Sequence, residues 1–524
     1  MSTQVHSEEE PKSTFQKHSY IIYFFAFWVI MTAWVIASFV LHPELPAVRA
    51  CLYVFVTLKL LFDIVGVSFV TKPIGSVAGV VSSIFSRFSE TVLTIAGAVL
   101  TLLLMLLVTF LSPTDENGTL IQRAQSLFGV LIIIFVLYAT SANRRAVKWR
   151  TVVLGIFLQY VLGIFVLKSQ VGYEIFKWLS EIFTKLVGYS TEGMSFVLNK
   201  DIASVKIFLL SALPGIIFIA ALVQICYYLG VMQWVILKFA WLMAYTLDTS
   251  GCESVVAAAS PFVGQGESAL LVKPFIENMT KSELHQVMAS GFATISGSIM
   301  MAFISLGVDG QTLITSCIMS VPCSLALSKL RYPETEVSES YGKVTIPQQE
   351  NAEVNILHAA ANGAAQGIHL VLLIVASIVA VISLISAVDA LIGWIGDVID
   401  IQGLSLSLII GYIFYPVAWC IGIEGKECLY VGQLLARKMM VNEFAAFTAL
   451  KELKDAGTLS IRSNSIATFS LCGFANFGSI GIQIGCLGAM APRRQGDLAS
   501  LAFSAMITGT FSTLISAAIA GLLL

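Results

Sequence analysis

The stretch that most constrains this chain runs from Ala467 to Gly485 and reads ATFSLCGFANFGSIGIQIG. It is apolar enough to lie in a membrane, yet four glycines interrupt it, and the polar residues Asn476 and Ser479 lie among them. In hydrocarbon every backbone N–H and C=O needs a partner, so irregular backbone survives only where protein buries it or where it lines a wet cavity. The stretch therefore predicts a broken helix beside a polar cavity.

A second stretch of the same character runs from Ala257 to Leu271 and reads AAASPFVGQGESALL. It has Pro261 and two glycines, with polar side chains between them. Broken, polar segments at corresponding places in two hydrophobic halves are the best sequence pointer to a transporter's substrate site. The order of apolar and broken segments repeats on either side of a polar segment, which predicts an inverted-repeat core with broken helices or re-entrant hairpins.

Composition places the protein in the lipid bilayer as an all-α polytopic protein. Of its 524 residues, 57% are hydrophobic and 12% are charged, whereas a soluble domain has about 25% charged residues. The net charge of -2 argues against nucleic acid as a partner, because nucleic acid requires a basic surface. No HExxH, GxSxG, Walker A or kinase motif is present, so we expect a protein that is not an enzyme and has no cofactor.

Five segments are expected along the chain. They are a disordered cytoplasmic N-terminus (1–18), three additional N-terminal transmembrane helices (19–112), a first half of the core (124–330), a polar linker (331–353) and a second half (354–524). The three additional helices are predicted at Tyr20–Leu41, Ala47–Val70 and Thr91–Leu111. In the second half, 355–369 is expected to form an interfacial helix that is separate from the apolar run 370–394.

A cluster of basic residues sets the orientation. Arg144, Arg145, Lys148 and Arg150 follow an apolar run, and such clusters mark cytoplasmic loops. The N-terminus is then cytoplasmic, and the loop carrying the glycosylation sequon at Asn117 is extracellular. Whether Asn117 is glycosylated stays open.

Two carboxylates are the first candidates for a binding site. Glu267 and Glu443 lie in apolar surroundings, where an ionisable group costs a few kcal/mol and is a functional candidate by default. A carboxylate with an amide suits sugar hydroxyls, and Gln with Glu offers donors and acceptors to a heterocyclic base. Phe474 could stack on a flat ring. The alternative is that these groups only satisfy one another inside a helix bundle.

Hard oxygen ligands for a coupling cation come from the same segments. The hydroxyls of Ser260 and Thr294 and the carbonyls of Val263 and Ile295 could bind sodium where the helices unwind. A hydroxyl alone usually bonds back to its own helix, so this interpretation depends on the neighbouring glycines. We expect Asp248 and Glu253, which precede the first broken stretch, to be structural.

Five runs resemble the concentrative nucleoside transporter family. They are FVGQGESALLVKPF (Phe262–Phe275), GFATISGS (Gly291–Ser298), CSLALSKL (Cys323–Leu330), NEF (Asn442–Phe444) and IRSNSIATFSLCGFANFGSIGIQIG (Ile461–Gly485). The resemblance begins near Val152, and the helices before the core look like those of the animal branch. It implies a cation-coupled symporter that carries nucleosides into the cell across the plasma membrane, a homotrimer, and an elevator-type mechanism.

The resemblance also implies residue roles. The base would contact Gln265 and Glu267, and Phe474 would line the pocket. The ribose would be held by Glu443, Asn476 and Ser479. The sodium site would be formed by Ser260, Val263, Thr294 and Ile295.

Two residues depart from the animal pattern. Ser260 stands where animal members have Asn, which removes an amide oxygen from the sodium site and leaves proton coupling as a rival to sodium. Gly266 stands where they have Thr, which predicts a larger pocket that accepts both purine and pyrimidine nucleosides. A solute channel is the alternative from another functional class.

Overall fold

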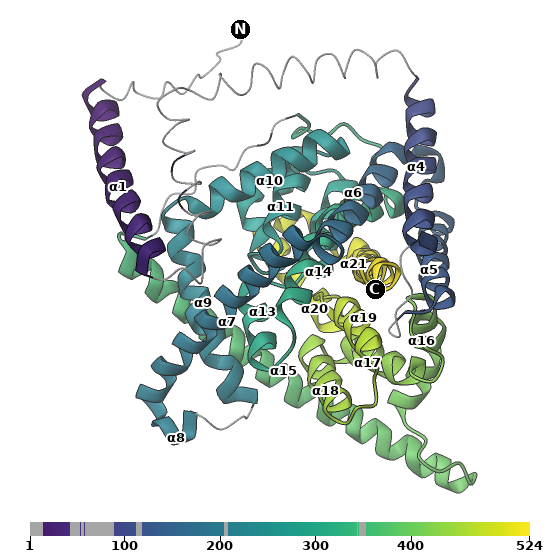
Figure 1. The fold of residues 1–524 in the computed structure, drawn as a ribbon. Coiled ribbons are helices and arrows are strands. Elements are labelled where there is room, and N and C mark those ends of the chain that lie inside the picture. The colour runs from purple at the N-terminus through teal and green to yellow at the C-terminus, as the bar shows by residue number, and fades with distance from the viewer. Residues whose placement is uncertain are drawn as a thin grey trace. The chain divides into compact units, whose positions relative to one another are not determined.

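The computed structural model describes residues 14–41, 53, 57, 89–111, 118–203, 208–342, 344 and 353–524, and every regular element in these ranges is a helix (Figure 1). The chain divides into two compact units, Met1–Leu93 and Thr94–Leu524. Seven of the described helices are long and apolar enough to cross a membrane, or eight spans if one bent pair counts as a span. The predicted all-α polytopic architecture is therefore confirmed.

The first unit contains the first predicted helix. This helix, α1, spans Thr14–Leu41, and its Trp28 Nε1 donates a hydrogen bond of 2.9 Å to Thr57 Oγ1. The third predicted helix corresponds to α4, Glu90–Leu111, which belongs to the second unit from Thr94 onward. The second, predicted at residues 47–70, lies almost wholly outside the described residues, as do most of the N-terminal segment and Asn117. Three additional helices therefore stay a prediction.

The second unit holds the remaining elements. Its first half contains α5 (Leu120–Ala139), η1 (Arg144–Ala146), α6 (Trp149–Leu167), α7 (Gln170–Leu198), α8 (Lys200–Ala203), α9 (Phe208–Tyr228), α10 (Val231–Leu247), α11 (Gly251–Ala259), η2 (Ser268–Asn278), α12 (Lys281–Ala293), α13 (Gly297–Ser305) and α14 (Gly310–Arg331). Its second half contains α15 (Ile356–Val398), α16 (Leu406–Cys420), α17 (Cys428–Met440), α18 (Glu443–Asp455), α19 (Ile461–Leu471), α20 (Phe477–Met490), η3 (Pro492–Arg494) and α21 (Gln495–Leu523).

Helices α14 and α21 pack against each other in the interior of this unit (Figure 1). Their contact carries hydroxyl groups, because Ser320 and Ser516 lie 3.2 Å apart through their Oγ atoms. Gln159 of α6 donates a bond of 2.8 Å to the same Ser516 hydroxyl. Small residues and interhelical hydrogen bonds are what hold helices together in lipid, so this seam forms a rigid support for the elements around it.

The same order of elements occurs twice. A hairpin of α11 and η2 precedes the broken pair α12–α13 and then α14. A hairpin of α17 and α18 precedes the broken pair α19–α20 and then α21. This order agrees with the predicted repeat of the two halves, and it puts both glycine-bearing stretches in comparable places.

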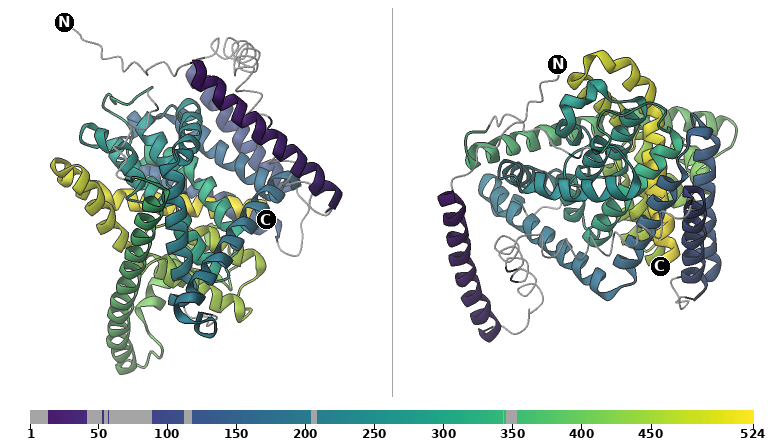
Figure 2. Two further views of the ribbon diagram at one scale, coloured as in Figure 1. Left: turned by 90° about the vertical axis from the view of Figure 1, so that its left-hand side faces the viewer. Right: turned by 90° about the horizontal axis from the view of Figure 1, so that it is seen from above.

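Helix α15 differs from the sequence-based expectation. It is one continuous helix of 43 residues, so the expected separation of 355–369 from 370–394 is wrong. Gly363 and Gly367 lie at the contact of α15 with α9, because a Cβ at these positions would lie 2.5 Å from Ala220 O and 2.9 Å from Ile217 Cα of α9. These glycines let α15 pack closely along α9 and do not end the helix (Figure 2). Helix α9 itself bends by 79° into α10.

Candidate functional site

The breaks in the two broken helix pairs meet. Thr294 adopts extended backbone after α12, and its carbonyl oxygen accepts a hydrogen bond of 3.3 Å from Phe474 N, which lies between α19 and α20. Gly473 makes this approach possible, because a Cβ there would lie 2.8 Å from Phe292 O and 2.8 Å from Thr513 Cγ2. The glycine-rich pattern in the sequence therefore marks a crossing point of two unwound segments.

A carboxylate and an amide face each other beside this crossing. Asn476 Nδ2 donates a hydrogen bond of 3.0 Å to Glu443 Oε2, and the residues are 3% and 5% exposed. Asn476 Oδ1 caps α20 by accepting a bond of 2.8 Å from Ser479 N. The structure thus brings together the three residues that the family resemblance assigns to the ribose.

Two glutamines join the first hairpin to α20. Gln483 Nε2 donates a bond of 3.1 Å to the Gln265 backbone carbonyl. In the described chain the side-chain oxygens of Gln265 and Gln483 have no hydrogen-bond partner, although the residues are only 7% and 0% exposed. Buried polar atoms without partners are rare in native structures and call for an explanation, and a bound polar solute would supply one.

Gln483 was not predicted from the sequence. It lies on α20 with Asn476 and Ser479 at the spacing of one helical face, because positions i, i+3 and i+7 lie on the same side of a helix. That spacing was the available signal. The glycines and the apolar run hid it, since they suggested a broken segment with no regular face.

Glu267 lies apart from these groups. Its Oε2 accepts a bond of 3.2 Å from Gly264 N, and it lines a cavity of about 250 Å³ together with Val263 and Ser298. The opposite wall of the cavity comes from α9 and α15, through residues that include Gln224, Tyr227 and Gln366. Glu267 therefore faces the α9–α15 pair, whereas Gln265 is buried against α20. The two residues assigned to the base, Gln265 and Glu267, are therefore not part of one buried cluster.

The packing of the first hairpin against α20 also explains why residue 266 is a glycine. A Cβ at this position would lie 2.6 Å from Cys486 Sγ of α20, so a larger residue would force α20 or the hairpin to shift. Gly266 thus lies in close contact with α20, and its predicted effect on the size of the pocket stays a prediction.

The four residues assigned to sodium lie near the same crossing. Gly297 N donates a bond of 3.3 Å to Phe262 O, which ties the hairpin tip to the break after α12. Ser260 Oγ donates to Val256 O at 2.7 Å and Thr294 Oγ1 donates to Ser290 O at 3.3 Å. Both hydroxyls therefore direct their hydrogens at their own helices, which leaves oxygen lone pairs for another partner. Ile295 is fully buried, and its carbonyl faces the Cys317 thiol at 3.9 Å.

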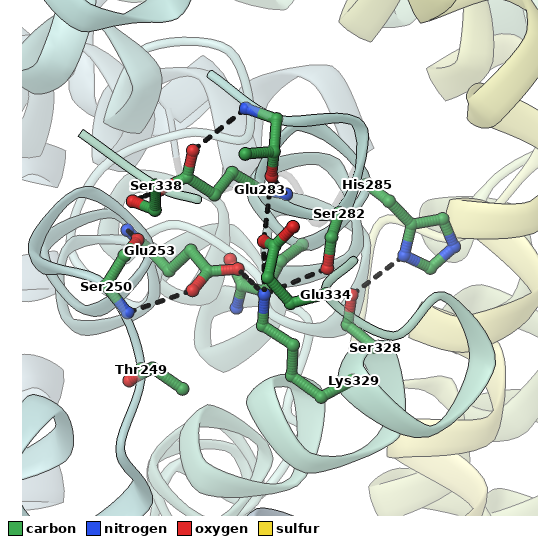
Figure 3. A network of polar contacts seen from close by, with 12 residues as sticks. Thr249, Ser250, Glu253, Ser282, Glu283, His285, Ser328, Lys329, Glu334 and Ser338 are labelled. Atoms are coloured by element: carbon green, nitrogen blue, oxygen red, sulfur yellow. Dashed lines mark hydrogen bonds and ion pairs between the residues drawn. The ribbon is translucent and has the colours of Figure 1, made fainter. Parts of the chain in front are cut away.

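A buried ion pair joins the start of α11 to the last turn of α14 (Figure 3). Lys329 Nζ lies 2.5 Å from Glu253 Oε1 and 3.3 Å from Glu334 Oε2. Glu253 also accepts a bond of 3.0 Å from Ser250 N, which caps α11. Glu253 is thus part of a network that fastens the chain after α14 to the first hairpin, in agreement with the structural role expected for it.

Family profiles cover most of the second unit. "Na+ dependent nucleoside transporter N-terminus" matches residues 128–201, "Nucleoside recognition" matches 209–309, and "Na+ dependent nucleoside transporter C-terminus" matches 312–521. The chain belongs to the concentrative nucleoside transporter family. This family consists of transporters and not of enzymes, as expected from the sequence.

Similar proteins agree with this assignment. Sodium/nucleoside cotransporter 1 of Mus musculus is 39% identical over 415 residues, which cover 77% of this chain and 64% of that protein. Sodium/nucleoside cotransporter 2 of Rattus norvegicus is 38% identical over 418 residues, or 77% and 63% of the two chains. The chain therefore matches a little under two thirds of the length of these curated relatives.

Solved structures resemble the fold as well. CNTnw in an inward-facing substrate-bound state is 35% identical with a TM-score of 0.73, and the match covers 77% of this chain and 98% of that one. A substituted form of CNTnw in an outward-facing state gives a TM-score of 0.74 at 35% identity, covering 77% and 99%. The fold of this chain is therefore similar to that of CNTnw over almost the full length of the CNTnw chain.

Proposed function

We propose that this protein is a concentrative nucleoside transporter that moves purine and pyrimidine nucleosides into the cell together with a cation. The observation that carries this proposal is the crossing of two unwound segments at the Phe474–Thr294 hydrogen bond, with a buried carboxylate–amide pair beside it. Oxygen-rich irregular backbone at the junction of two repeats is how secondary transporters bind solutes and ions. The profiles and relatives named above support the substrate class.

The groups at the crossing match the two parts of a nucleoside. Glu443 would accept hydrogen bonds from ribose hydroxyls, and Asn476 and Ser479 would complete that contact. The unpartnered amide oxygens of Gln265 and Gln483 would accept bonds from the base, with Phe474 lining the pocket. Glu267 would meet the base, or a passing substrate, from the cavity beside α9.

Sodium is the coupling ion that we favour, because the curated relatives are sodium/nucleoside cotransporters. Ser260 and Thr294 would offer hydroxyl oxygens, and Val263 and Ile295 would offer carbonyl oxygens. Proton coupling is the second candidate. Ser260 offers a hydroxyl oxygen where the expected Asn would offer an amide oxygen, and Glu443 is a buried carboxylate that could carry a proton.

Transport would follow an elevator-type mechanism. Helices α11, α12, α19 and α20 pack on α14 or α21, whereas α9 packs along α15 and against α13. The cavity at Glu267 is lined by the tip of the first hairpin, α9 and α15. A homotrimer in the plasma membrane with a cytoplasmic N-terminus completes the proposal. Native mass spectrometry of the detergent-purified protein tests the trimer, and a monomeric mass would contradict it.

Uptake of labelled uridine and adenosine in cells that express the chain tests the function. We expect accumulation above the external concentration when sodium is present, and its loss when choline replaces sodium at fixed pH. Uptake that ignores sodium and rises as external pH falls would identify protons as the driving ion. Uptake that is unsaturable and only equilibrates would indicate a channel and refute the proposal.

A further inference from the structure

A buried lysine lies beside the second break and has no carboxylate close to it. Lys438, in the last turn of α17, is 1% exposed. Its Nζ donates a hydrogen bond of 2.8 Å to Ser470 O and one of 3.3 Å to Thr513 Oγ1. Within the described residues it is in none of the ion pairs, which extend to 4.0 Å. A buried charge without such a partner costs several kcal/mol unless other groups compensate it.

The end of α19 supplies that compensation. Ser470 lies in the last turn of α19, which ends at Leu471. The last carbonyls of a helix have no partner inside it and carry a partial negative charge. The ammonium group is therefore held by a carbonyl in the last turn of α19 and by the Thr513 hydroxyl.

The oxygen atoms around Lys438 are of the kinds proposed for sodium in the first half. There, Ser260 follows the first arm of a hairpin, α11, and Thr294 follows the helix before the break, α12. In the second half, Lys438 lies in the last turn of the first arm of a hairpin, α17, and Ser470 lies in the last turn of the helix before the break, α19. Each half thus places a backbone carbonyl and a hydroxyl near its break, but only the second half adds a cationic side chain.

We propose that the ammonium group of Lys438 acts at the α19–α20 break as a built-in cation, in the role that a transported sodium ion has at the α12–α13 break. This inference rests on the proposed sodium-coupled function. It makes Lys438 a positioning residue, which holds the end of α19 against α17 and α21 without binding substrate. Because the lysine is covalently attached, its charge returns with the protein and adds nothing to the charge delivered per nucleoside.

Two substitutions separate the charge of this side chain from its size. In Lys438→Ser the side chain shrinks and leaves a hydroxyl beside Ser470 O and Thr513 Oγ1, which makes room for one more sodium ion. In Lys438→Met the space stays filled by an uncharged chain. Lys451→Ser in α18, a residue that is only partly buried, is the matched control.

The experiment measures uridine-evoked current and labelled uridine flux in the same voltage-clamped cells, at several sodium concentrations. The unsubstituted protein is measured first, and absence of sodium-coupled uptake there would refute the proposed function and not this inference alone. We expect Lys438→Ser to carry one additional elementary charge per uridine and to show a steeper sodium dependence. Lys438→Met should reach the surface but transport at no sodium concentration, and Lys451→Ser should behave like the unsubstituted protein.

An unchanged charge-to-uridine ratio in Lys438→Ser, or its failure to transport at any sodium concentration, would overturn the inference. Normal uptake by Lys438→Met would do the same, since no positive charge would then be needed at the break. If the variants do not reach the surface, the inference is tested by the melting temperature of the purified proteins in detergent, measured at several sodium concentrations. It should rise more steeply with sodium for Lys438→Ser than for the unsubstituted protein, and equal slopes would contradict the inference.

Discussion

Replacing Glu443 by Gln is the most direct test of the ribose site. The substitution keeps the shape of the side chain but removes the charge that accepts the 3.0 Å bond from Asn476 Nδ2. A hydrogen bond to a charged group contributes about 1.5–3 kcal/mol, and each 1.4 kcal/mol changes an affinity about tenfold. If Glu443 holds one ribose hydroxyl in this way, uridine affinity should fall by about 10- to 150-fold, and uptake at low uridine should be almost abolished.

The assay is the concentration dependence of sodium-driven uridine uptake, normalised to surface protein. Glu452→Gln, on the exposed face of the same helix α18, is the control and should leave uptake unchanged. Deoxyuridines that lack the 2′- or 3′-hydroxyl make the test specific. The analogue that lacks the hydroxyl bound by Glu443 should lose much less affinity from the substitution than uridine does. Equal losses for uridine and both analogues, or unimpaired uridine uptake, would refute the assignment.

Three further substitutions test other contacts. Gly473→Ala should abolish uptake and lower the melting temperature, because its Cβ would meet atoms at 2.8 Å and overpacking costs about 1–3 kcal/mol; Gly481→Ala, with open space around it, should have little effect on either measurement. Glu253→Gln should reduce the free energy of unfolding in detergent by about 1.5–3 kcal/mol, because Lys329 loses its closer carboxylate and keeps only Glu334; unchanged stability would show that the Glu253–Lys329 pair is dispensable. Ser260→Ala should raise the sodium concentration for half-maximal uptake, whereas an unaltered sodium curve would remove this residue from the proposed ion site.

The breaks themselves were predictable because their signal is local. Gly473 and Asn476 in an apolar run are incompatible with a plain helix in lipid, and the structure has α19 end and α20 begin within this stretch. Residues around the breaks could be nominated because carboxylates and amides are rare and costly in a membrane. That reasoning brought Glu443 and Asn476 forward, and they contact each other.

The remaining features depend on contacts between distant parts of the chain. Gly363 and Gly266 look like helix breakers or pocket spacers in sequence, but their function depends on α9 and α20, which pack against them. Lys438 resembles an ordinary basic residue at a helix end, and only the position of Ser470 shows that it is buried at a break. Such properties come from tertiary packing, which sequence spacing within one segment does not encode.

The length of α15 has a consequence for the bilayer around this protein. At about 1.5 Å per residue, its 43 residues extend about 65 Å, roughly twice the thickness of a hydrocarbon core of about 30 Å. A helix of this length must either tilt steeply or project well beyond the acyl chains, and tilting is the usual answer to such a mismatch. Lipids with longer or shorter chains would then alter the slope of α15 and of α9 packed along it, so turnover in reconstituted vesicles should vary with acyl-chain length.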